Sequence, residues 1–129
     1  MSINYNNRPQ VSKAVALSAD KKIPLLHAHK KLRVHAAKLM SAGAIAASGT
    51  NYAALKLQKS SASGVAPADI AGSSVVDTQA GVAAYGHVAL DVSPSIELEA
   101  GETLYLDVDI NGTLTLDAHV DVDYEVVGN

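Results

Sequence analysis

The chain has 129 residues, of which 48% are hydrophobic, and it contains no cysteine, tryptophan or phenylalanine. This length is typical of a single domain with its own core, and the lack of cysteine excludes disulfides and thiolate metal sites. The start of the sequence lacks the basic and apolar regions of a secretory signal, and no apolar run approaches the ~20 residues that cross a bilayer. The composition therefore predicts one domain with an aliphatic core and no membrane partner.

The net charge of −3 hides a division between the two halves of the sequence. All ten basic residues lie between Arg8 and Lys59 with one acid, Asp20, so this part carries +9, whereas the twelve other acids follow Ser60 and give −12. One explanation is that strands from the two parts lie side by side and pair their charges. Another is that the basic part of one copy meets the acidic part of the next. Nucleic acid is not an expected partner, because no aromatic residues are interspersed among the basic ones.

Residues 1–24 are predicted to form an extended N-terminal arm, and residues 25–129 a single domain. Weak alternation of apolar residues over Val11–Leu17 favours an arm that adds to another surface as a strand. Pro24 closes this segment, because it lacks an amide proton and keeps the preceding residue away from helical angles. The predicted partner-binding residues on the arm are Tyr5, Arg8, Lys13 and Leu17.

Leu25–Met40 is predicted to be a basic strand region with a bulge or turn at Lys30-Lys31. Its expected apolar side consists of Leu26, Ala28, Leu32, Val34 and Ala36. His27 and His29 point to one side of such a strand, as some metal sites require. Two lysines follow directly and would oppose a cation, so we expect a solvated or salt-bridged basic face and no metal or other cofactor.

The middle of the chain contains one clear strand and one long irregular segment. Thr50–Lys59 alternates, and Leu55 and Leu57 are its expected inward pair. Ser60–Tyr85 is rich in small residues, which bury little area, and it is predicted to be a long loop with a single helical turn at Thr78–Ala84.

Two strictly alternating runs at the C-terminal end predict half-buried strands. Leu104, Leu106, Val108 and Ile110 form one inward row, and Val120, Val122, Tyr124 and Val126 form the other. Asn111-Gly112 between them is typical of a hairpin turn. A two-residue hairpin would place buried and exposed side chains on the same face, so the chain either forms a glycine bulge or crosses from one sheet to another, which we favour. Together with the short strands from Gly86 onward, these runs predict an all-β fold, an antiparallel sandwich.

Parts of the sequence resemble small jelly-roll virion proteins of tailed bacteriophages, capsid decoration or cement proteins in particular. The resemblance is carried by Gly86–Val92, Ile96–Leu104 and Val120–Glu125, with Gly43–Tyr52 like the turn that enters an early strand, and it covers residues 30–127. It implies a jelly roll without catalytic residues that assembles as a homotrimer. It also implies binding to the phage major capsid protein, assembly in the host bacterial cytoplasm and a final location on the capsid surface of the virion.

The sequence contains no motif of a hydrolase, a cysteine nucleophile or a zinc helix, so we do not expect an enzyme. Asp107, Asp109, Asp121 and Asp123 would suit a calcium site or a carboxylate pair if they shared a face, although alternating acids are more often solvated or paired with bases. The alternative to a capsid protein is a phage fibre, tail or baseplate domain that binds a host glycan. Its aromatic platforms would be Tyr52, Tyr85 and Tyr105.

Overall fold

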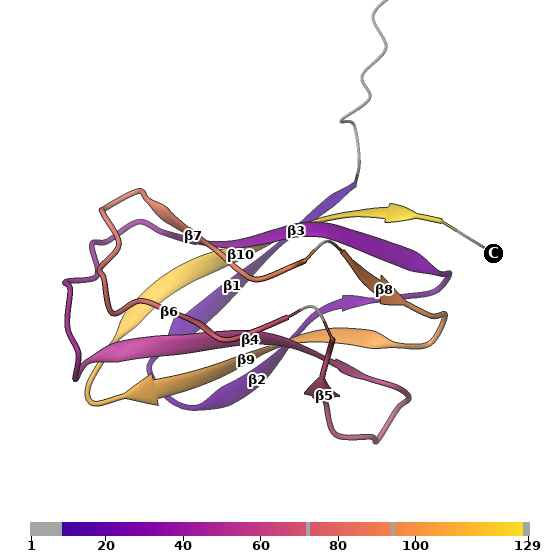
Figure 1. Cartoon of the computed structure of the whole chain (residues 1–129), viewed down its shortest axis with the longest axis horizontal. Helices are drawn as coiled ribbons and strands as arrows, with labels where there is room; N and C mark the ends of the chain where they lie inside the picture. Colours follow the sequence, from indigo (N-terminus) through magenta and orange to yellow (C-terminus); the bar gives the residue numbers. More distant parts are fainter. Residues whose placement is uncertain (1–8, 72, 94, 128–129) are drawn as a thin grey trace, which may run out of the picture.

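The computed structural model describes residues 9–71, 73–93 and 95–127, and this part of the chain is all β. Two five-stranded antiparallel sheets lie one above the other (Figure 1). Sheet A contains β1 (Gln10–Leu17), β10 (Leu116–Val126), β3 (Leu32–Ser41), β7 (His87–Ala89) and β8 (Ile96–Leu98). Sheet B contains β2 (Lys21–His27), β9 (Thr103–Asn111), β4 (Tyr52–Ser60), β5 (Ala68–Asp69) and β6 (Val76–Asp77). The described residues form no helix long and apolar enough to span a membrane.

The strand order confirms the predicted antiparallel sandwich and has the connectivity of a jelly roll. Sheet A runs β1-β10-β3-β7, with β8 also on β3, and sheet B runs β2-β9-β4-β5, with β6 also on β4. The long strands β1 to β4 alternate between the sheets, and so do β9 and β10. The last two long strands therefore each lie between two strands from the N-terminal half.

The core consists of the inward rows of the two sheets. On β9, Leu104, Leu106 and Val108 are fully buried, and on β10 Val120 and Val122 are equally enclosed. Leu55 and Leu57 are the predicted inward pair of β4, and both are fully buried. Each large aliphatic side chain buried in this way contributes about 1.5–3 kcal/mol, so alternation along the long strands holds the two layers together.

Two bulges change which residues of the basic region face inward. Leu25 is the extra residue between Pro24 and Leu26 in the pairing of β2 with β9, and His35 is the extra residue of β3 opposite Asp123 and Tyr124. A bulge shifts the alternation by one residue. The buried residues of this region are therefore Leu25, Ala28, Leu32, Val34, Ala37 and Leu39, and not the predicted Leu26 and Ala36. The predicted turn at Lys30-Lys31 is confirmed, since it joins β2 to β3.

The predicted crossing after β9 is confirmed, because β9 belongs to sheet B and β10 to sheet A. Gly112 has a φ of +69°, which suits glycine. The Asn51 side chain holds the crossing, since its Oδ1 accepts the Thr113 amide at 2.9 Å.

The structure corrects the predicted boundary between arm and domain. Residues 10–24 are part of the sandwich, because β1 pairs with β10 over its whole length and β2 pairs with β9. Leu17 is fully buried in the core. The sandwich therefore includes at least residues 10–24, while residues 1–8 lie outside the described part of the chain.

The long segment Ser60–Tyr85 is not a free loop, and the predicted helical turn at Thr78–Ala84 is wrong. The segment lies along β4 through β5 and β6, and Val82 forms a bridge with Ile45. Hydroxyl groups complete this contact: Thr78 Oγ1 accepts the Ala53 amide at 3.0 Å, and Ser73 Oγ accepts the Leu57 amide at 3.3 Å. Buried backbone groups require such partners, so these two side chains cover an edge of β4 that short strands leave unpaired.

Candidate interaction surface

The ion pairs found between described residues join the basic part of the sequence to the acidic part. They are Lys22–Asp107, Lys31–Glu97, Lys31–Glu99, Arg33–Glu97, Arg33–Glu125, His35–Glu125, Lys56–Asp69 and Lys59–Glu102. Each pair links a residue before Ser60 to one after it, which confirms the predicted pairing of charges between neighbouring strands. Lys31 and Arg33 hold the pKa of Glu97 below its ordinary range, and Glu97 in turn raises the pKa of Lys31.

The outer face of sheet B is closed by a network of such contacts. Lys22 Nζ donates to Gln58 Oε1 at 2.7 Å and lies 3.1 Å from Asp107 Oδ1. Gln58 Nε2 donates to Asp69 at 2.8 Å, and Lys56 reaches the same carboxylate at 2.8 Å. Hydrogen bonds from Lys56 and Gln58 lower the pKa of Asp69. Most polar groups on this face thus have partners within the chain.

The outer face of sheet A has a different character, and we name it the alanine face. Its residues alternate with the buried rows of their strands and therefore point away from the core. They are Ser12, Ala14 and Ala16 on β1, Ala36, Lys38 and Met40 on β3, His87 and Ala89 on β7, and Asp117, His119, Asp121 and Asp123 on β10. Among the described residues, no ion pair involves Lys38, Asp117 or Asp121. This face therefore combines small side chains with charged groups, among which Lys38 lies opposite Asp121 in the register of β3 and β10.

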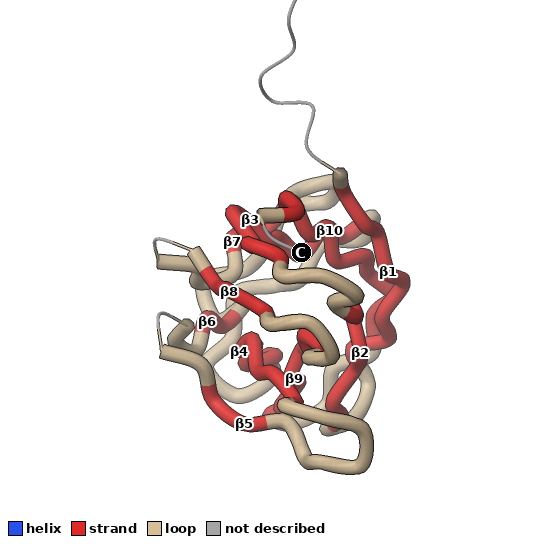
Figure 2. The backbone as a smooth tube through the Cα atoms, turned by 90° about the vertical axis from the view of Figure 1, so that its right-hand side faces the viewer, coloured by secondary structure: helices blue, strands red, loops and turns tan. Residues whose placement is uncertain are grey.

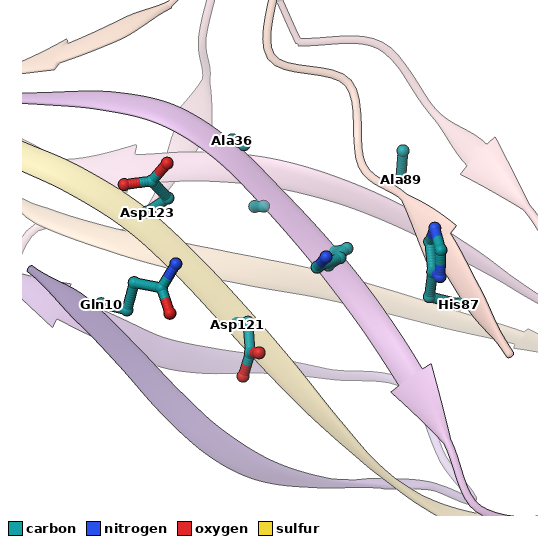
Figure 3. Close-up of a pocket in the computed structure, with 8 residues that line it drawn as sticks. Gln10, Ala36, His87, Ala89, Asp121 and Asp123 are labelled. Atoms are coloured by element: carbon teal, nitrogen blue, oxygen red, sulfur yellow. The ribbon is translucent and has the colours of Figure 1, made fainter. Parts of the chain in front are cut away.

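Two depressions follow the alanines. One, of about 220 Å³, is lined by Gln10, Ala36, Ala37, Lys38, His87, Ala89, Asp121 and Asp123. Figure 3 shows Gln10, Asp121 and Asp123 on one side of β3 and His87 on the other. The second, of about 470 Å³, is a groove lined by Ala14, Val15, Ala16, Asp117, Ala118 and His119. Short side chains leave both depressions open. At their margins, carboxylates can accept hydrogen bonds and Lys38 can donate them.

The described residues contain no group of three or more His, Asp or Glu side chains placed to hold a metal ion. His27 and His29 do lie together, with ring centroids 4.9 Å apart in an edge-to-face arrangement. His27 Nδ1 is hydrogen-bonded to Thr103 Oγ1 at 2.8 Å, so this ring already has a partner on β9.

The four aspartates considered for a calcium site or a carboxylate pair do not share one face. Asp107 and Asp109 lie on β9 in sheet B, whereas Asp121 and Asp123 lie on β10 in sheet A. Partial burial and the nearby charges of Asp107 and Asp20 raise the pKa of Asp109. The carboxylates thus form two separate pairs on opposite outer faces.

The structure places the predicted partner-binding residues in different environments. Lys13 is exposed at the middle of β1, whereas Leu17, a few residues further on, is buried and unavailable to a partner. Tyr5 and Arg8 lie outside the described residues. Of the two residues that the structure describes, only Lys13 is accessible to a partner.

Tyr85 is the most exposed large apolar side chain in the described part of the chain, at 89%. It occupies a tight turn in which the Gly86 amide donates to the Ala83 carbonyl at 2.8 Å, and its φ of +61° is unusual for an aromatic residue. Tyr52 and Tyr105, predicted with it as sugar platforms, are half-buried on sheet B. Tyr52 and Tyr105 are therefore less accessible to a sugar than Tyr85 is.

Sequence reasoning missed the alanine face. The signal was present as small residues at every second position, Ser12, Ala14 and Ala16. It indicates a face only when β10 is known to lie beside β1, and β3 beside β10. No protein-family model matches the sequence, and no curated protein matches it significantly. The functional inference therefore depends on the surface itself.

Proposed function

We propose that the chain is a non-enzymatic structural protein that docks through its alanine face onto a protein lattice, as a phage capsid decoration protein. The alanine face is the observation that carries this proposal. Small side chains on a sheet allow a partner surface to approach closely, and charged side chains around them favour complementary charges across an interface. The outer face of sheet B, by contrast, largely satisfies its own charges.

The resemblance over residues 30–127 and the jelly-roll connectivity together supply the finer terms of the proposal. By that resemblance the protein assembles as a homotrimer, binds the major capsid protein and stays on the virion surface after assembly in the host cytoplasm. Fold alone does not specify a role, so the proposal depends mainly on the docking surface.

The alternative role, a fibre or baseplate domain that binds a glycan, has one supporting feature, the exposed ring of Tyr85. Sugar sites usually combine an aromatic platform with several convergent polar groups. A glycan array with the full chain tests this role, and reproducible binding to one sugar class that is lost in Tyr85→Ala would support it over the capsid role.

The capsid role is tested by co-sedimentation of the purified chain with empty shells of the major capsid protein encoded in the same genome. Ala89→Arg places a long cation in the depression of the alanine face and should weaken binding at least about tenfold, because it blocks close approach. Ala54→Arg, on the outer face of sheet B between Asp109 and Asp77, is the matched control and should bind like the wild type. Light scattering of the full chain measures whether it is a trimer.

Equal binding by the Ala89→Arg and wild-type chains would overturn the assignment of the alanine face. A genome that encodes no capsid protein would overturn the virion role.

A further inference from the structure

The two sheets have four edges, and three of them carry features that prevent the addition of another strand. On one side of the sandwich, β5 and β6 are two residues long and β7 and β8 are three. On the other side, β2 contains Lys21, Lys22, Pro24 and a bulge. Short length, proline, lysine and bulges are the common means of protecting a sheet edge.

The fourth edge, β1, differs from these three. It runs for eight residues without proline, and its register with β10 is continuous from Gln10 to Leu17. Figure 2 shows β1 along the margin of the molecule, beside the edge strand β2. Sheet A therefore ends in one long, regular strand.

The hydrogen-bond pattern shows which backbone groups this edge offers. The Tyr124 amide donates to the Pro9 carbonyl at 3.1 Å, next to the pair Gln10 and Asp123 in the register. In an antiparallel ladder, hydrogen-bonded positions alternate with positions whose groups point away from the partner. The outward amide and carbonyl groups of β1 consequently belong to Gln10, Ser12, Ala14 and Ala16.

Lys13 occupies the middle of the inward row of this strand. In that row Val11 is half-buried and Val15 and Leu17 are buried, and Val120 opposite Lys13 is fully buried, yet Lys13 itself is exposed. An inward-pointing charge on an edge strand disfavours pairing with an apolar strand. It also disfavours pairing of two β1 strands, since residues 10–17 contain no acid to neutralise Lys13 of the other copy.

We propose that the β1 edge binds an extended segment of another polypeptide by strand addition, and that this segment carries a carboxylate opposite Lys13. Apolar side chains on either side of the carboxylate would face Val11 and Val15, which continue the inward row. The outward backbone groups of Gln10, Ser12, Ala14 and Ala16 supply the affinity, while Lys13 selects the partner by charge. The edge has this preference whether or not the chain belongs to a virion.

The test uses the full chain labelled with ¹⁵N and a short peptide with the central sequence Val-Thr-Glu-Thr-Val. Amide resonances of β1 should shift on titration, and the peptide should bind about fivefold more tightly than one with lysine in place of glutamate, as expected for a cross-strand charge pair. Lys13→Glu should reverse this preference. Lys30→Glu, which changes an exposed lysine in the turn between β2 and β3, is the matched control and should leave it unchanged.

Ala14→Pro separates strand addition from simple charge attraction. It removes an outward amide without removing a bond to β10, so the chain should stay folded, which its amide spectrum reports, and lose peptide binding. Peptides that shift no β1 resonance, or a Glu and a Lys peptide of equal affinity, would overturn the proposal. Shifts of the same amides with rising concentration of the chain alone would also overturn it, because the occupant would then be a second copy.

Discussion

At the scale of single residues, Tyr85 combines backbone strain with exposure. Its positive φ costs a non-glycine residue about 1–2 kcal/mol, and a ring that is 89% exposed gains little from packing. Tyr85→Gly should therefore raise the free energy of unfolding slightly, by up to about 1 kcal/mol after the greater entropy of unfolded glycine is subtracted. Urea denaturation measures this change. Val75→Gly, at an exposed position without a positive φ, is the control and should lower stability; a similar loss for Tyr85→Gly would mean that the ring packs.

Glu97 makes the stability of the protein depend on acid pH. Its pKa is lowered by Lys31 and Arg33, so the ionised form of Glu97 is more stable in the folded state than in the unfolded state. Its contribution is fully present above the unfolded pKa and is lost in the acid window below that value, as the pH falls through the folded pKa. Glu97→Gln should flatten the fall of the melting temperature across this window. An unchanged slope would show that other carboxylates cause the acid sensitivity.

At the scale of elements, the crossing from β9 to β10 depends on Gly112. A Cβ there would collide with the Asn51 side chain and the Thr50 carbonyl, whereas Gly101, also at positive φ, faces open space. Gly101→Ala should cost about 1 kcal/mol from backbone strain alone, and Gly112→Ala about 3 kcal/mol, because it also displaces the Asn51 clamp. Thermal unfolding of both variants measures the difference. Equal losses would mean that the crossing adjusts to the added carbon.

The elements also show how far the sequence predicts the fold. Strict alternation predicted β4, β9 and β10, because each buries one face against the opposite sheet. The strand β1 gave a weak signal, since Lys13 interrupts its inward row, and an edge strand therefore looked like a free arm. The bulges at Leu25 and His35 escaped prediction because they arise from pairing with distant strands. The alanine face escaped for the same reason, as it spans strands that are distant in sequence.

At the scale of the whole molecule, the division of charge coincides with the topology. Within the described residues, every ladder joins one of β1 to β4, which end at Ser60, to one of β5 to β10, which begin at Ala68. Neither half contains a ladder of its own. The basic strands are thus interleaved with acidic ones, and the ion pairs between the halves follow from this arrangement.

This interleaving predicts that the chain can be divided into two fragments that fold only together. A cut in the exposed segment between Ser63 and Gly64 gives fragments of charge +9 and −12, and each alone should be unfolded because its strands have no partners. Mixed in equal amounts, they should restore the β-sheet circular dichroism and the amide spectrum of the intact chain. Opposite charges should speed their association at low salt, and sodium chloride at about 0.5 M should slow it at least tenfold. A fragment that unfolds cooperatively by itself would contradict this prediction, since it would then contain a stable core of its own.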